Sequence, residues 1–116
     1  MTVLEISGAK IAGAPISWGV CEVPGWGHQL STDRVLREMR QAGLAATELG
    51  PAGFLPADPM ALRGLLDGYG LDCVGTFAPA VLHRAGHDPL KDVAAALGSI
   101  VATGASTLVL AAASGA

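Results

Sequence analysis

Charged side chains are scarce in this sequence, and aromatic ones are scarcer still. Only 15% of the 116 residues are Asp, Glu, Lys or Arg, 4% are aromatic, and 51% are hydrophobic. The formal net charge is −3, and no cluster of Lys and Arg provides the positive surface that nucleic acids or anionic membranes attract. We therefore expect a protein whose partners include neither nucleic acid nor a membrane surface.

Cysteine and targeting signals are equally sparse. The chain has only two cysteines, Cys21 and Cys73, without the C-x-x-C spacing of a metal or redox site. Separate thiols of this kind are typical of a reducing compartment. The N-terminus lacks the basic start and apolar run of a signal peptide, and Gly98, Gly104 and Ser106 interrupt the apolar C-terminal stretch. We predict a cytoplasmic protein without a membrane span.

A strand-then-helix unit recurs along the chain. The predicted strands are four apolar segments, at residues 11–18, 44–49, 71–77 and 107–111. The predicted helices follow the first three strands, at residues 32–42, 59–69 and 89–103. Pro15 cannot donate a hydrogen bond to a sheet, so it must lie near the end of the first strand or at a bulge. No helical pattern follows the fourth strand.

The ends of the predicted helices carry clear signals. Asp58 and Asp88 each precede a proline, and this combination of an N-cap with proline in the first turn is typical of a helix start. Gly43, Gly70 and Gly104 each come directly after a helical pattern, where a left-handed residue usually ends a helix. The alternation of strands and helices predicts an α/β fold with a parallel sheet.

Two architectures fit this order, an open doubly wound sheet and a (β/α)8 barrel. The doubly wound fold expects a short G-x-G-x-x-G turn after the first strand, but the loop there is long and contains Trp18, Cys21 and Trp26. Long loops after the strands and short glycine turns before them favour the barrel. A complete barrel needs about 250 residues. We therefore expect residues 1–116 to be the N-terminal half, about four βα units, of an incomplete barrel, with open sheet edges that can self-associate.

Four residues near predicted strand ends are candidate substrate contacts. Glu48 closes an apolar strand at the end where barrel enzymes place substrate and metal contacts; the alternative is an ordinary exposed glutamate. Trp18 can pack against the apolar face of a sugar ring or anchor a loop in the core. His83 follows the third strand and is a site residue or a surface histidine. Phe54 lies in the second loop and is predicted to be a lid or a plug.

Two short motifs are similar to known ones. Residues 14–18 (Ala-Pro-Ile-Ser-Trp) and residues 47–50 (Thr-Glu-Leu-Gly) resemble the xylose-isomerase-like TIM barrels, the sugar phosphate isomerase/epimerase superfamily. Residues 50–59 more specifically resemble the inosose dehydratase branch, whose members dehydrate a keto-inositol. The resemblance runs from about Ile11 to the last residue.

The resemblance implies an isomerase or lyase that removes a proton alpha to the carbonyl of a polyol or sugar. It implies a divalent metal, manganese or cobalt, acting as a Lewis acid, with Glu48 as a substrate-side carboxylate and Trp18 and the Phe54 loop as pocket wall. The family's metal ligands come from later strands, so we expect no metal site and no activity in residues 1–116 alone. The alternative function is a non-catalytic half-barrel that acts only by assembly with itself or with a complementary half.

Overall fold

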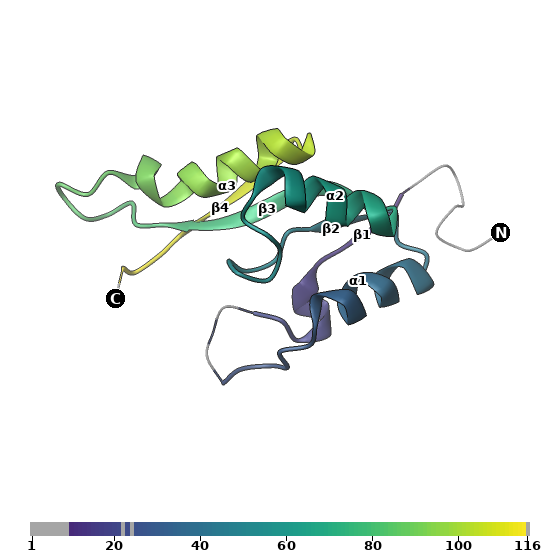
Figure 1. Cartoon of the computed structure of the whole chain (residues 1–116). Helices are drawn as coiled ribbons and strands as arrows, with labels where there is room; N and C mark the ends of the chain where they lie inside the picture. Colours follow the sequence, from purple (N-terminus) through teal and green to yellow (C-terminus); the bar gives the residue numbers. More distant parts are fainter. Residues whose placement is uncertain (1–9, 22, 24, 116) are drawn as a thin grey trace.

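The computed structural model describes residues 10–21, 23 and 25–115. Its elements alternate along the chain as the sequence predicts (Figure 1). They are β1 (Ala12–Gly13), the 3₁₀ turn η2 (Pro15–Trp18), α1 (Thr32–Gln41), β2 (Ala46–Glu48), α2 (Pro59–Tyr69), β3 (Asp72–Ala80), α3 (Pro89–Thr103) and β4 (Thr107–Ala112). No helix in these residues is long and apolar enough to cross a membrane.

The four strands form one parallel sheet in the order β1-β2-β3-β4. Because crossovers between parallel strands are right-handed, strands added in one direction place every helix on the same face of the sheet. In agreement, α2 packs against both α1 and α3 (Figure 1). A doubly wound sheet would instead reverse its direction at a switch point. The α/β prediction is confirmed, and the sequential order is that of the first half of a (β/α)8 barrel.

The predicted helix caps form as expected. The side chains of Ser31, Asp58 and Asp88 each accept a hydrogen bond from a first-turn backbone N–H, at 3.2, 2.9 and 3.0 Å. Gly70 and Gly104 end α2 and α3 in the left-handed conformation, with φ of 69° and 74°. Each cap satisfies backbone groups that the helix itself leaves unpaired, so local sequence fixes where these helices begin and end.

The first predicted strand is wrong in its length. Only Ala12 and Gly13 pair with β2, in register with Ala46 and Thr47. Pro15, which has no N–H, begins a 3₁₀ turn instead of continuing the strand. The other strands differ at their ends: β2 is shorter than predicted, while β3 extends to Ala80 because it pairs with the whole of β4.

The core lies between the sheet and the helices. Val35, Leu36 and Met39, the predicted apolar stripe of α1, have no exposed surface. They join a main core cluster with Val20, Leu49, Leu55, Leu62, Leu66 and Leu71. A smaller cluster joins Ala78 and Ala80 of β3 to Val93 of α3.

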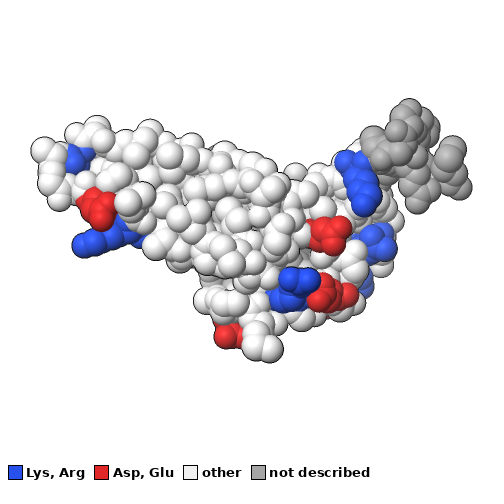
Figure 2. Space-filling model, turned by 90° about the horizontal axis from the view of Figure 1, so that it is seen from above, with Lys and Arg blue, Asp and Glu red and all other residues white. Residues whose placement is uncertain are grey.

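Viewed from above, the charged side chains gather toward the ends of the molecule and leave an uncharged stretch between them (Figure 2).

A β-bulge interrupts the pairing of β2 with β3. Thr47 pairs with Cys73, whereas Glu48 pairs with Gly75, so Val74 is the extra residue of the bulge. Cys73 packs against the main core cluster on the helix side. Because side chains alternate between the two faces of a strand, one extra residue reverses the alternation beyond it. Gly75 and its partner Glu48 therefore lie on the face of the sheet opposite to Cys73, away from the helices.

Beyond the bulge the odd-numbered residues of β3 face away from the helices. Phe77 is 47% exposed, and its partner Val109 in β4 is 43% exposed. Pro79 and Ala111 form the next pair on the same side. We call the sheet surface formed by Glu48, Phe77, Pro79, Val109 and Ala111 the open face. In a barrel this surface would face the interior.

Candidate functional site

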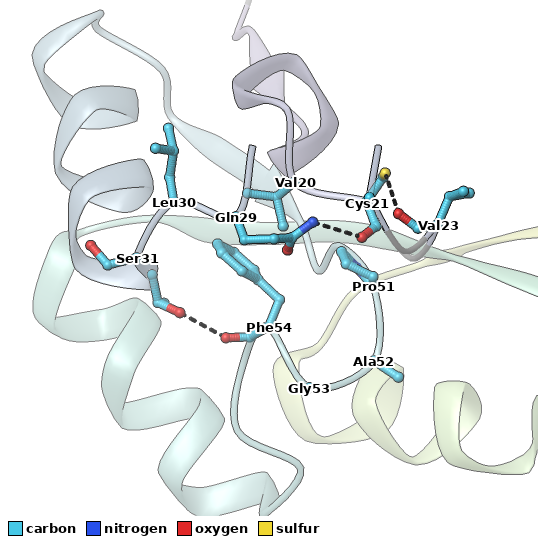
Figure 3. A pocket seen from close by; sticks show the side chains of 12 residues that line it. Val20, Cys21, Val23, Gln29, Leu30, Ser31, Pro51, Ala52, Gly53 and Phe54 are labelled. Carbon is cyan, nitrogen blue, oxygen red and sulfur yellow. Dashed lines mark hydrogen bonds between the residues drawn. The ribbon is translucent and has the colours of Figure 1, made fainter. Parts of the chain in front are cut away.

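An open pocket of about 580 Å³ lies at the end of the sheet where β1 and β2 lead into their helices. Its twelve lining residues come from the loop between η2 and α1 with the start of α1 and from residues 51–54 of the loop between β2 and α2 (Figure 3). Loops that follow the strands build the active sites of barrel enzymes. The pocket therefore occupies the expected position for a substrate.

Among the residues that the structure describes, the lining of this pocket includes no charged side chain. Val20, Leu30 and Phe54 provide large apolar side chains, while Gln29 and Ser31 contribute an amide and a hydroxyl. Small-molecule sites typically combine apolar walls with a few polar groups that orient the ligand. Because the described lining side chains include no cation, this part of the pocket offers an uncharged ligand better complementarity than a phosphorylated one.

Phe54 lines the pocket, as the loop position suggested. Its N–H donates to the carbonyl of Pro51 at 3.2 Å, in a turn that includes Gly53 with φ of 87°. The hydroxyl of Thr32, in the first turn of α1, donates to the carbonyl of Phe54 at 2.7 Å (Figure 3). This bond joins the two loops that enclose the pocket. Sequence reasoning did not select Thr32.

Glu48 ends β2 on the open face and does not line the pocket. Its carboxylate makes no hydrogen bond or ion pair with another described residue, while its backbone carbonyl accepts from the hydroxyl of Thr47 at 2.6 Å. The side chain is partly exposed. The carboxylate thus remains available at the strand end that the sequence analysis selected, and its substrate role stays a prediction.

Trp18 lies on the helix side of the sheet, outside the pocket lining. Its indole N–H donates to Glu38 of α1 at 3.2 Å, and its ring packs against the main core cluster. Glu38 also pairs with Arg34 at 2.8 Å. The Arg34 hydrogen bond, aided by that of Trp18, lowers the pKa of the Glu38 carboxyl. These contacts anchor the loop, and a ligand contact by Trp18 stays a prediction.

His83 is exposed in the loop between β3 and α3. The same loop is fastened by Asp92 in the first turn of α3, whose Oδ2 accepts from the Val81 N–H at 2.9 Å and lies 2.8 Å from Nε2 of His87. The Val81 N–H, and then His87, lower the pKa of the Asp92 carboxyl. The structure places His83 near the end of β3 but not among the pocket residues.

Potential metal ligands are dispersed. Among the residues that the structure describes, no three or more His, Cys, Asp or Glu side chains come together in a group that could hold a metal ion. Divalent metals of the expected kind need several oxygen or nitrogen ligands at once. The described residues therefore do not fit the metal site that the resemblance implies.

Comparison with known proteins gives several relatives but no matching protein-family model. Inosose dehydratase of Geobacillus kaustophilus (strain HTA426) is 40% identical over 68 residues, which are 59% of this chain and 21% of that protein. The rhizopine catabolism protein MocC of Rhizobium meliloti is 48% identical over 63 residues, 54% of this chain and 19% of that protein. Inosose dehydratase of Erwinia tasmaniensis is 35% identical over 68 residues, 59% of this chain and 22% of that protein.

The matched segments thus span about a fifth of the length of these curated relatives. The two inosose dehydratases among them agree with the branch that the motif at residues 50–59 indicated. Over 54–59% of its length, the chain is therefore similar in sequence to inosose dehydratases and to a rhizopine catabolism protein.

Proposed function

We propose that this chain forms the substrate-side, N-terminal half of the barrel mouth in an inosose dehydratase or a related sugar isomerase/epimerase. The observation that carries the proposal is the pocket between the loops after β1 and β2, whose described lining is uncharged, at the sheet end that Glu48 also occupies. The inosose dehydratases among the relatives support a cyclic polyol ketone as the substrate class. The two free cysteines support a reducing, cytoplasmic compartment.

The proposed ligand matches the chemistry of the site. A cyclitol ring has apolar C–H faces and a polar rim of hydroxyl groups, so Val20, Leu30 and Phe54 would contact a face. Gln29 and Ser31 would hydrogen-bond the rim. Glu48 does not line the pocket but ends β2 at the same end of the sheet. There it would accept hydrogen bonds from two hydroxyls on the part of the ring that projects from the pocket, because a carboxylate offers two acceptor oxygens. Charge-assisted bonds of this kind are stronger than neutral ones.

The proposed reaction begins with removal of a proton alpha to the carbonyl, and in a dehydratase a neighbouring hydroxyl then leaves. In this scheme the described residues bind and orient the ring, and we assign the base to none of them. The divalent metal, manganese or cobalt, is proposed for the complete enzyme only. Since the described residues do not fit it, we assign it no ligand here and derive no step from it.

A titration with inosose, followed by NMR of the chain's backbone amides, tests this proposal. We expect saturable shifts at Gln29, Ser31, Phe54 and Glu48. The variant Glu48→Gln should weaken binding by about tenfold, because it replaces a charged acceptor by a neutral one. The control is Asp67→Asn, on the exposed surface of α2. Absence of saturable shifts, or shifts confined to other regions, would contradict the proposal.

A second candidate function is a non-catalytic half-barrel that acts by assembly. It is favoured by the exposed apolar residues of the open face, since Phe77 and its partner Val109 are 47 and 43% exposed. Contiguous apolar surface of this kind is typical of an interaction site. A stable dimer that binds no inosose in the same titration would favour this function over the enzymatic one.

A further inference from the structure

The two loops that enclose the pocket are joined by the hydroxyl of Thr32. It donates to the carbonyl oxygen of Phe54 at 2.7 Å, across 22 positions in the sequence. Among the described residues, this is the one side-chain hydrogen bond between the loop that leads into α1 and the loop that leads into α2. Figure 3 shows the bond directly beside the ring of Phe54.

The Thr32 end of this bond is held rigidly. Thr32 is the first residue of α1, and the preceding Ser31 caps the helix by accepting from the Arg34 N–H at 3.2 Å. The same helix buries Val35 and Leu36 completely. A threonine side chain also has few accessible rotamers. The hydroxyl is therefore a donor at a fixed place on the pocket rim.

The Phe54 end is held by packing, since Leu55 is buried in the main core cluster and Phe54 packs against it, but it has few hydrogen bonds. Residues 50–58 form no strand and only turns before α2 begins. Gly50 and Gly53 adopt φ of 75° and 87°, a region that glycine enters without strain, so the backbone on either side can pivot. The one local bond is that of the Phe54 N–H to Pro51 at 3.2 Å. Thr32 thus supplies the hydrogen bond that ties the Phe54 carbonyl to the start of α1.

We propose that Thr32 is a positioning residue that fixes the Phe54 wall of the pocket and prepares it for its ligand. Loss of the hydroxyl leaves the partly buried Phe54 carbonyl without its partner and frees the loop. Ligand binding must then order the loop, which weakens affinity. The choice of a cyclic polyol as ligand rests on the proposed function, whereas the effect on the loop does not.

Hydrogen exchange of the intact chain, measured without ligand, tests the effect on the loop. In Thr32→Val, which keeps the shape but lacks the donor, the amide of Phe54, which is bonded to Pro51, should exchange about five- to tenfold faster, because a bond of this kind contributes that much to local closure. Thr32→Ser keeps a hydroxyl and should restore exchange close to the original rate. Thr103→Val is the matched control, because the Thr103 hydroxyl bonds a carbonyl in α3 at 2.8 Å.

The outcomes are distinct. Unchanged exchange at Phe54 in Thr32→Val, with the variant folded by circular dichroism, overturns the proposal. Faster exchange throughout the chain, or equal acceleration in Thr32→Ser, also overturns it, because the effect would then be general destabilisation. In a parallel inosose titration, Thr32→Val should bind several-fold more weakly than Thr32→Ser. If no variant binds inosose, the proposed function fails, and the exchange data still decide the role of Thr32.

Discussion

The carboxylate of Asp92 lies 2.8 Å from Nε2 of His87, and the same oxygen accepts the backbone N–H of Val81. This arrangement ties the loop after β3 to the first turn of α3. It also determines how the loop responds to acid, because a protonated Asp92 is a weaker acceptor for both partners.

Asp92 should make the stability of the chain dependent on pH in the acid range. Its pKa is lowered in the folded state, first by the Val81 N–H and then by His87. The corresponding stabilisation is fully present above the pKa of Asp in the unfolded chain, about 3.9. It is lost as the pH falls through the lowered pKa of Asp92 in the folded chain. In urea titrations from pH 7 to pH 2, the difference between the original chain and Asp92→Asn should shrink below about pH 4. If the difference in unfolding free energy between the two chains were the same at every pH, this prediction would be wrong.

Tyr69 should titrate at unusually high pH. Its hydroxyl donates to the Asp33 carboxylate, and this bond raises the pKa of the phenol. Tyr69 is the only tyrosine in the sequence, so the ultraviolet absorbance of tyrosinate reports on it alone. The midpoint of the Tyr69 titration should lie above about pH 10, and Asp33→Asn should lower that midpoint. The stabilisation is present below the unfolded pKa and is lost as the pH rises through the folded one. Asp67→Asn should leave the midpoint unchanged.

The bulge between β2 and β3 makes Gly75 sensitive to substitution. A Cβ added there would collide with the backbone carbonyl of Thr107, which begins β4. Gly75→Ala should therefore reduce the free energy of unfolding by about 1–3 kcal/mol. Gly64→Ala is the matched control, since Gly64 lies in α2 and an added Cβ there meets nothing within 4 Å. That variant should gain about 0.5–1 kcal/mol through helix propensity. If urea unfolding showed equal changes in the free energy of unfolding for the two variants, the pairing of Gly75 with Thr107 would be contradicted.

The features that sequence predicted best are those set by neighbouring residues. Asp58 and Asp88 with their following prolines mark two helix starts, and the structure begins α2 and α3 there. The α/β class follows from the same local alternation. Residues 11–18 were misjudged because an apolar run reads as a strand even though the backbone turns at Pro15.

The features that sequence missed depend on contacts between distant segments. Thr32 and Asp92 act on carbonyl and amide groups 22 and 11 positions away, and no local pattern marks such a pairing. The bulge at Val74 depends on the register of two strands joined through a helix. Phe54 lines the pocket, and its substrate role stays a prediction, whereas Trp18, also at a predicted strand end, turns toward α1.

Self-association, if it uses the open face, should respond to a charge on β4 and not to one on the helix layer. Val109 of the open face and Leu97 of α3 are almost equally exposed, at 43 and 44%. Val109→Lys would place an ammonium group in the apolar contact, where burying an unpaired charge is costly. We expect it to weaken association by at least about tenfold in sedimentation equilibrium. Leu97→Lys should leave association unchanged, since α3 lies on the other side of the sheet. Equal weakening by both variants would place the contact elsewhere, and a monomer at all concentrations would exclude the assembly function.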